Sequence, residues 1–156
     1  MMKLTLTSAA LTLALSGGAY AQQGNPGAHF VQNWDQDGNG AVTQAEAQTM
    51  RDNLFTTFDA DEDGKLSAEE FDAFDAVRAA DQKEMRAELG VKAGGGMGKG
   101  MWPGMMRAEG GLMRAFNDAD GDGAVSREEF VGRTADWFAT MDQTGDGKIT
   151  EDDLAR

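Results

Sequence analysis

The chain has 156 residues, of which 27 are Asp or Glu and 14 are Lys or Arg, and its net charge is −13 at pH 7. This acidic balance argues against binding to nucleic acids or anionic membranes, which attract basic proteins, and favours the binding of cations. There is no cysteine, which excludes disulfides and a thiol-linked lipid anchor. The length is typical of one or two small domains.

The first 21 residues, MMKLTLTSAALTLALSGGAYA, are typical of a secretory signal peptide. Lys3 precedes an apolar run, and the segment ends in A-Y-A, which matches an A-x-A cleavage site. The apolar run is shorter than the ~20 residues of a membrane-spanning helix. A buried N-terminal helix is the alternative interpretation. The sequence therefore predicts cleavage near Ala21 and a periplasmic location, with secretion to the medium as second choice.

The stretch DQDGNGAVTQAE, residues 35–46, has an oxygen-bearing side chain at places 1, 3 and 5, glycine at place 6 and an acid at place 12. Three more copies occupy residues 59–70, 118–129 and 142–153, and we number the four loops in chain order. A single copy could be only a turn rich in Asp and Asn. Four copies favour calcium, a hard cation that takes roughly six to eight oxygen ligands from alternating places of a tightly curled loop.

Each loop offers further ligands and the means to turn. The backbone carbonyl at place 7 adds an oxygen, and a glutamate at place 12 is long enough to give two. Place 9 carries only a short hydroxyl, so we expect a water to bridge there. Glycine at place 6 permits a backbone reversal that a Cβ would oppose.

The predicted metal ligands stand at places 1, 3, 5, 7 and 12 of each loop. They are Asp35, Asp37, Asn39, Ala41 and Glu46; Asp59, Asp61, Asp63, Lys65 and Glu70; Asp118, Asp120, Asp122, Ala124 and Glu129; and Asp142, Thr144, Asp146, Lys148 and Asp153. The fourth loop departs from the others, because Thr144 replaces a carboxylate or amide and Asp153 is one methylene shorter than glutamate. We therefore expect three strong calcium sites and one weaker site that could accept Mg²⁺.

On these loops the chain resembles the EF-hand calcium-binding proteins, and as a whole it looks like the small calmodulin-like EF-hand proteins of bacteria. The resemblance covers roughly Phe30 to the C terminus, apart from the middle segment. It implies an all-α fold of four helix-loop-helix units and a role as a calcium sensor or buffer. A calcium-dependent docking module with a protein target is a further alternative. The sequence has no catalytic constellation, so we expect no enzymatic activity.

Within each half, only 12 residues separate one loop from the next, which is too few for an exiting helix, a turn and an entering helix. Met50, Leu54, Phe55 and Phe58 lie on one helical face of the first connector. We expect each pair of loops to share one short continuous helix, although Gly132 weakens the second. Loops at opposite ends of a straight helix cannot pair easily, so the second loop is expected to pair with the third and the first with the fourth. A kinked connector with two ordinary lobes is the alternative.

The domain organisation follows from this pattern. We expect a signal peptide at 1–21, a first pair of EF-hands at 22–90, a Gly/Met-rich linker at 91–103 and a second pair at 104–156. The halves align without a gap at an offset of 83 residues, which indicates a duplicated unit. The first pair is expected to end in a long helix with Phe71, Phe74, either Val77 or Arg78, and Met85 on one side. A short helix is expected after Pro103.

Four methionines, Met97, Met101, Met105 and Met106, lie in or next to the linker. Methionine is an adaptable filler of cores and partner-binding surfaces, but thioethers also bind Cu(I). Packing or partner contact is the first interpretation, and periplasmic copper handling is the alternative. A zinc site is not expected, since His29 is the one histidine and cysteine is absent.

Overall fold

The computed structural model describes residues 26–88 and 103–156. The predicted signal peptide and the linker residues up to 102, including Met97 and Met101, lie outside these ranges. The elements in chain order are α1 (Pro26–Trp34), β1 (Val42–Thr43), α2 (Gln44–Phe58), β2 (Lys65–Leu66), α3 (Ala68–Glu88), α4 (Pro103–Gly110), α5 (Arg114–Asn117), β3 (Val125–Ser126), α6 (Arg127–Gly132), α7 (Thr134–Met141), β4 (Lys148–Ile149) and α8 (Glu151–Ala155). The fold is all-α, as predicted. Within the two described ranges, no helix combines the length and apolar character needed to cross a bilayer.

Helix α2 runs without interruption from the first loop to the second, which confirms the predicted shared helix. Its start is stabilised by a capping box, in which the Thr43 hydroxyl accepts from the Glu46 N–H and the Glu46 carboxylate accepts from the Thr43 N–H. Helix α2 contains neither glycine nor proline, the residues that most disfavour a helix interior.

The connector of the second half is not one helix, and here the prediction of a continuous shared helix was wrong. Helix α6 ends at Gly132 and α7 begins at Thr134, with Arg133 between them at φ −80° and ψ 4°. The break is mild, because the Arg133 N–H still donates to the Glu129 carbonyl (3.2 Å). Gly132 lowers the stability of the helix at this point, since glycine is about 1 kcal/mol less favourable than alanine inside a helix.

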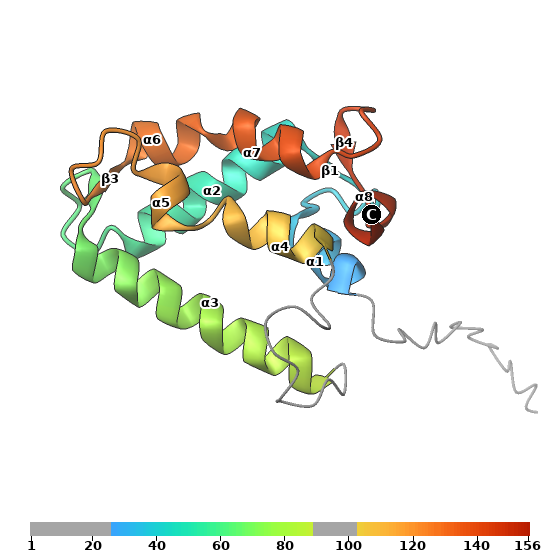
Figure 1. Cartoon of the computed structure of the whole chain (residues 1–156), viewed down its shortest axis with the longest axis horizontal. Helices are drawn as coiled ribbons and strands as arrows, with labels where there is room; N and C mark the ends of the chain where they lie inside the picture. Colours follow the sequence, from blue (N-terminus) through green and yellow to red (C-terminus); the bar gives the residue numbers. More distant parts are fainter. Residues whose placement is uncertain (1–25, 89–102) are drawn as a thin grey trace, which may run out of the picture.

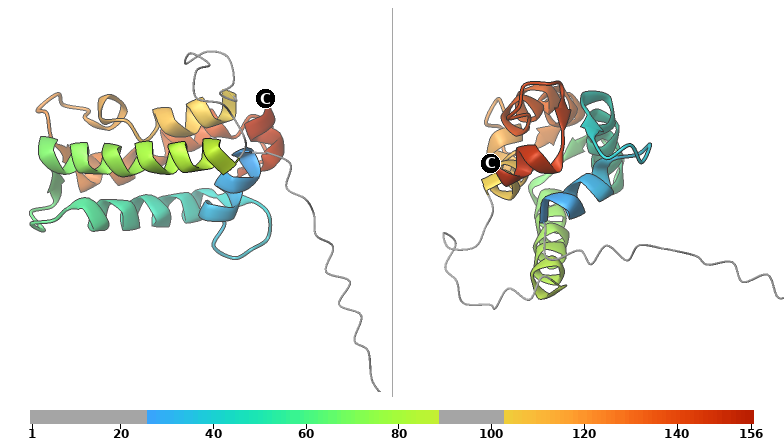
Figure 2. Two further views of the ribbon diagram at one scale, coloured as in Figure 1. Left: turned by 90° about the horizontal axis from the view of Figure 1, so that it is seen from below. Right: turned by 90° about the vertical axis from the view of Figure 1, so that its right-hand side faces the viewer.

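The loops pair across the two halves of the chain. Strand β1 pairs antiparallel with β4, placing Val42 opposite Ile149, and β2 pairs with β3, placing Leu66 opposite Val125. The predicted pairing of first with fourth and second with third loop is therefore confirmed. Figure 1 shows the two loop pairs at opposite ends of the bundle formed by α2, α6 and α7, and the left view of Figure 2 shows the same separation along its length.

The core is built from both halves. One cluster of buried side chains includes Phe30, Phe55, Phe71, Phe130 and Trp137, which come from five different helices. Aromatic rings join these helices in pairs that cross the halves: the Trp34 and Trp137 centroids lie 4.9 Å apart and those of Phe55 and Phe130 lie 6.1 Å apart. The two halves therefore bury their apolar faces against each other.

The buried face of α2 differs from the predicted one. Ala47, Arg51 and Phe55 are its fully buried residues, whereas Met50, Leu54 and Phe58 pack at the margin of the core. The spacing of four residues still gives one helical stripe. An arginine therefore occupies a central core position.

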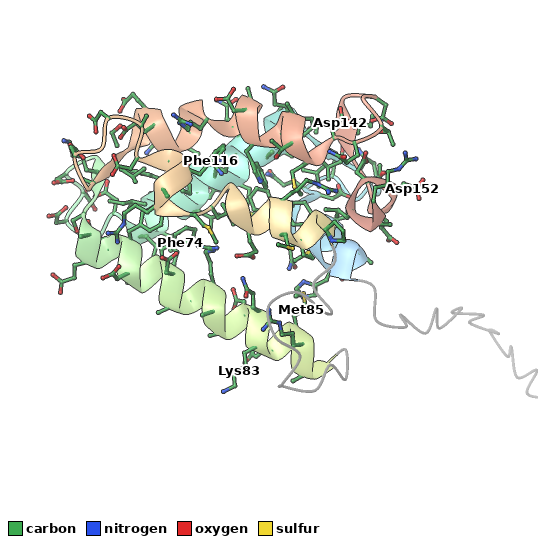
Figure 3. The ribbon with its side chains drawn as sticks, viewed as in Figure 1. Phe74, Lys83, Met85, Phe116, Asp142 and Asp152 are labelled. Atoms are coloured by element: carbon green, nitrogen blue, oxygen red, sulfur yellow. The ribbon has the colours of Figure 1, made fainter. Side chains whose placement is uncertain are left out.

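On α3 the choice left open between Val77 and Arg78 is decided in favour of Arg78. The Val77 side chain is 47% exposed, whereas Arg78 is half-buried and forms ion pairs with Asp75 (2.6 Å) and Glu109. Figure 3 shows Lys83 on the outer side of α3 and Met85 on the side that faces α1 and α4.

The helix that enters the third loop is broken. A helix begins at Pro103, as predicted, but α4 ends at Gly110, and the loop is entered from the four-residue α5. A Cβ on Gly111 would lie 1.8 Å from Cδ1 of Trp137, so this position accepts only glycine at the present spacing. The close approach of the chain to Trp137 explains the glycine at position 111.

Candidate metal centre

In each loop the aspartate at place 1 organises the turn by accepting hydrogen bonds from backbone N–H groups further along the loop. Asp35 accepts from Gly38 (2.8 Å) and Gly40 (2.7 Å). The same bonds recur in the third loop, from Gly121 and Gly123 to Asp118, and in the fourth, from Gly145 and Gly147 to Asp142. The hydrogen bond from Gly40 is the main cause that lowers the pKa of Asp35, so this carboxylate stays ionised.

The glutamate at place 12 closes the loop with both oxygens. Glu46 Oε1 accepts from the N–H of Gln36 (2.9 Å) near the loop start, and Oε2 accepts from the N–H (2.8 Å) and hydroxyl (2.7 Å) of Thr43. The Thr43 N–H is the leading cause of the lowered pKa of Glu46. Backbone N–H groups at place 9 likewise lower the pKa of the glutamates in the second and third loops, from Ser67 to Glu70 and from Ser126 to Glu129.

In the first three loops the predicted carboxylates converge. Within the described residues, three groups each have ligand oxygens within 4.8 Å of one another: Asp35, Asp37 and Glu46; Asp59, Asp61 and Glu70; and Asp118, Asp120 and Glu129. Oxygens bound to one calcium at ~2.3–2.6 Å lie no more than about 5 Å apart, so the spacing fits this ion. The ligand set also fits, because a hard cation prefers clustered carboxylates and carbonyls.

The remaining predicted ligands of these loops occupy the stretch that leads into the strands. Asn39 and its counterparts at place 5, Asp63 and Asp122, accept from the N–H at place 7 (2.8–3.0 Å). The place 7 residues themselves, Ala41, Lys65, Ala124 and Lys148, stand at or immediately before the start of the short strands. The Lys65 ammonium also lies 3.5 Å from the Asp122 carboxylate of the paired loop.

The fourth loop closes in the same manner despite its shorter acid. Asp153 accepts from the N–H groups of Gln143 (2.9 Å), Thr144 (2.8 Å) and Thr150 (2.8 Å). Burial of Asp153 works to raise the pKa of its carboxyl, but the hydrogen bonds from Thr150 and Thr144 outweigh it, and the pKa is lowered. Asp153 is fully buried, and Arg107 of α4 donates to its carbonyl (2.8 Å). Because Thr144 stands at place 3, this loop has three ligand carboxylates, one fewer than the second and third loops.

Sequence reasoning missed the importance of place 4. Gly38, Gly121 and Gly145 have φ of 73–74°, and in the second loop Glu62 adopts φ 58°. This left-handed conformation is costly for a residue with a Cβ. Glycine at place 4 in three of the four loops was the available signal.

Met105 and Met106 are the two linker-region methionines in the described ranges, and they lie in different surroundings. Met105 is 8% exposed and belongs to the core, whereas Met106 is 53% exposed. Met105 is therefore accounted for by packing. Its neighbour on α4 is free to contact solvent or a partner.

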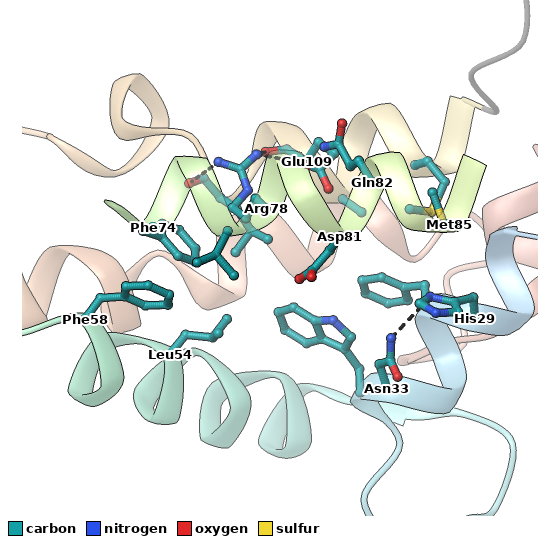
Figure 4. A pocket seen from close by; sticks show the side chains of 16 residues that line it. His29, Asn33, Leu54, Phe58, Phe74, Arg78, Asp81, Gln82, Met85 and Glu109 are labelled. Carbon is teal, nitrogen blue, oxygen red and sulfur yellow. Dashed lines mark hydrogen bonds and ion pairs between the residues drawn. The ribbon is translucent and has the colours of Figure 1, made fainter. Parts of the chain in front are cut away.

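His29 lines an apolar groove rather than a ligand cluster. The groove has a volume of ≈ 180 Å³ and lies between α1 and α2 on one side and α3 and α4 on the other, as Figure 4 shows. Its lining is mostly apolar and includes Trp34, Phe58 and Phe74, and the carboxylates of Asp81 and Glu109 also line it. His29 Nδ1 is 3.2 Å from the Asn33 amide nitrogen.

Comparison with known proteins agrees with this geometry. A family model described as EF hand matches residues 50–75, 117–131 and 134–156, which contain the second, third and fourth loops. The first loop precedes the first matched segment, but it has the same hydrogen bonds and pairs with the fourth. A search of curated proteins gave no significant match. The chain thus has an all-α EF-hand fold, and the matches support a calcium-binding protein.

Proposed function

We propose that this EF-hand protein is exported and acts in the periplasm or outside the cell by binding calcium, without catalysing a reaction. The observation that carries the proposal is the convergence of three carboxylates within 4.8 Å in each of the first three loops. Such clustered charges repel one another, and a divalent cation relieves the repulsion. Calcium binding therefore stabilises the folded loops relative to the unfolded chain.

In this proposal the side chains have distinct tasks. The carboxylates at places 1 and 3 supply charge, the residue at place 5 and the carbonyl at place 7 supply further oxygens, and the glutamate at place 12 closes the shell. The hydrogen bonds to Asp35 and Glu46 hold these groups ionised and oriented, so little reorganisation is needed on binding. The fourth loop, with Thr144 and Asp153, is proposed to bind calcium more weakly and to accept Mg²⁺.

Titration calorimetry with Ca²⁺ and Mg²⁺ tests this proposal. We expect about three equivalents of calcium to bind with measurable heat, and a fourth, weaker equivalent in which Mg²⁺ competes. The variant Asp35→Asn/Asp59→Asn/Asp118→Asn should lose the strong equivalents, while its circular dichroism in the absence of metal stays that of the wild type. Absence of heat and of stoichiometric uptake at millimolar calcium would overturn the proposal.

Within this class we favour a sensor over a buffer. The apolar groove between α1–α2 and α3–α4 supports this choice, because a buffer does not need an accessible apolar surface. Three of its walls, α1, α2 and α3, enter or leave the first two loops, so we expect metal binding at these loops to move the walls. A dye whose fluorescence rises on apolar surfaces should respond to calcium, and an unchanged signal would indicate a buffer.

Export is proposed from the N-terminal segment alone. N-terminal sequencing of the protein purified from a periplasmic fraction should begin at Gln22. A chain that keeps residues 1–21 and remains in the cytoplasm would contradict this part of the proposal.

A further inference from the structure

Arg51 is the one fully buried basic residue in the described ranges, and its guanidinium joins α2 to the third helix-loop-helix unit. Its Nε donates to the Phe130 carbonyl (3.0 Å), Nη1 to the Gly111 carbonyl (2.8 Å) and Nη2 to the Asn117 side-chain oxygen (2.6 Å). Within the described part of the chain it forms no ion pair with a carboxylate. It is therefore a core cation held by neutral oxygens.

Two of these partners border the third loop. Asn117 precedes Asp118, the first ligand position, and Phe130 follows Glu129, the last. Asn117 is itself fully buried, and its amide nitrogen donates to the carbonyls of Gly111 (3.1 Å) and Met113 (2.8 Å). The guanidinium thus holds the two ends of the third loop at a set separation.

A buried cation without a counterion is costly, so its retention calls for compensation. Burial lowers the pKa of Arg51 to about 10, which leaves the group protonated at neutral pH. Its Cζ lies 4.3 Å from the ring centroid of Phe130 and 5.3 Å from that of Trp137, within the range of a cation–π contact. The aromatic rings and the carbonyl and amide oxygens compensate part of the desolvation cost. The planar guanidinium of arginine can donate hydrogen bonds to several oxygens at once.

The equivalent positions of the duplicated unit, found by the offset of 83 residues between the two halves, have no such arrangement. The position equivalent to Arg51 is Thr134, and the position equivalent to Asn117 is Trp34. Thr134 is buried, but its hydroxyl donates to the Val131 carbonyl of the preceding helix α6 (2.6 Å) and not to another helix-loop-helix unit. The first loop is therefore bordered by an apolar contact where the third has a polar clamp.

The third loop is also the one that needs outside support. It is entered from α5, a helix of four residues, whereas the first loop follows the nine-residue α1. One turn of helix holds an end weakly by itself. A bond from a long neighbouring helix supplies the missing rigidity.

We infer that Arg51 is a positioning residue for the third metal loop: from α2 it fixes Asn117 and Phe130, and thereby sets the distance between Asp118 and Glu129 before the cation binds. This inference rests on the proposed function, since it concerns calcium affinity. It also makes the third loop depend on the helix that joins the first two loops. Outer residues that orient metal ligands typically change affinity by about 10–100-fold when replaced.

The test measures each loop separately by NMR, using the amide of the place 6 glycine, which donates to the place 1 aspartate in all four loops. Calcium is titrated into the wild type, Arg51→Lys and Asn117→Ala. We expect the midpoint at Gly123 to rise about tenfold in both variants, and the midpoints at Gly40 and Gly147 to change less than about twofold. The double variant should bind calcium at the third loop no more weakly than the weaker single variant, because the two substitutions break the same interaction.

Thr134→Val is the matched control, since it alters the equivalent buried position of the other half. It should leave the Gly123 midpoint unchanged. An unchanged Gly123 midpoint in both Arg51→Lys and Asn117→Ala would overturn the inference about Arg51 while leaving the proposed calcium binding in place. An equal rise of the midpoint at all four glycines would also overturn it, because it would indicate general destabilisation. A wild type without any calcium response would overturn the proposed function and the clamp together. If Arg51→Lys fails to fold, Asn117→Ala decides.

Discussion

At the scale of single residues, the backbone at place 4 distinguishes the second loop from the others. Glu62 has the left-handed conformation that glycine provides in the first, third and fourth loops. For a residue with a Cβ this conformation costs roughly 1–2 kcal/mol. Replacing it by glycine recovers less than this amount, because glycine loses more conformational freedom on folding. The second loop therefore carries local strain that the others avoid.

Glu62→Gly is accordingly expected to raise the free energy of unfolding by about 0.5–1 kcal/mol. Urea denaturation in the presence of a chelator measures this change. Glu62→Gln is the control, because it removes the same charge but keeps the Cβ. A gain of equal size in both variants would show that charge, and not the backbone, is responsible.

A second prediction at this scale concerns Thr144, which stands at place 3 of the fourth loop. Its side chain is exposed and offers a hydroxyl where the first three loops have a carboxylate. Thr144→Asp adds a charged ligand, so the calcium affinity of this loop should rise on the order of tenfold. The Gly147 amide reports the change in an NMR titration. Thr144→Asn replaces the hydroxyl by a longer, uncharged amide oxygen and should have a smaller effect. No difference from wild type in either variant would show that place 3 does not contact the ion.

The carboxylates at place 12 provide a pH test. The pKa of Glu129 is lowered from its usual 4.5 by the hydrogen bonds of Ser126, so its ionised form stabilises the fold above pH 4.5. This stabilisation is lost as the pH falls through the lowered pKa. The melting temperature of metal-free Glu129→Gln should lie below that of the wild type at pH 7, and the difference should close as the pH falls from 4.5 through the lowered pKa of Glu129. A difference that stays constant over this range would contradict the assignment.

At the scale of elements, packing requires a glycine at position 111, between α4 and α5. A Cβ on Gly111 would meet the Trp137 ring, whereas a Cβ on Gly110 would have no neighbour within 4 Å. The break in the entering helix thus lets the chain pass directly over Trp137. The same passage brings the Gly111 carbonyl to Arg51 and to Asn117.

Gly111→Ala is expected to lower the free energy of unfolding by about 1–3 kcal/mol, the usual cost of overpacking a core. Gly110→Ala is the matched control next to it and should change the free energy by less than about 0.5 kcal/mol. Chemical denaturation followed by tryptophan fluorescence measures both. Equal effects would mean that the chain at Gly111 relaxes away from Trp137.

At the scale of the whole molecule, the halves depend on each other. Both strand pairs join a loop of one half to a loop of the other, and α2 packs along α6 and α7. Ion pairs between Arg127 and Asp52 (2.6 Å) and between Arg114 and Asp72 (2.8 Å) add to the contact, although exposed pairs of this kind contribute little. Apolar burial between the halves is the larger contribution.

Fragments cut between α3 and α4 should therefore fold poorly alone. We expect residues 22–90 and 104–156, expressed separately with calcium present, to show much less helix by circular dichroism than the intact chain. An equimolar mixture should recover helix, because the two fragments complete each other's core. Two fragments that are each fully helical and do not associate would contradict this dependence.

How far sequence reasoning reached depended on the range of the interactions. The interactions that shape each loop are local. Asp35 accepts hydrogen bonds from Gly38 and Gly40, and Glu46 caps the helix in which it lies. A twelve-residue pattern is therefore enough to predict the loop. The shared helix α2 and the cross-half pairing also followed, since the short distance between Glu46 and Asp59 favours one straight helix over a kinked connector, and loops at opposite ends of such a helix do not pair easily. The break at Arg133 did not follow, because a single glycine only lowers helix stability and tertiary packing decides whether the helix breaks.

The amino-acid sequence by itself determined four acidic loops and the helices that carry them, because oxygen spacing, glycine position and capping residues act within one turn of chain. Only the tertiary structure decided that Arg51 lies in the core and that Asn117 and Gly111 meet it there. Gly111 and Asn117 lie 60 and 66 positions from Arg51 in the chain, and no periodic pattern marks a buried cation whose partners are neutral oxygens. Their meeting depends on how two amphipathic halves pack, which is a property of the whole fold.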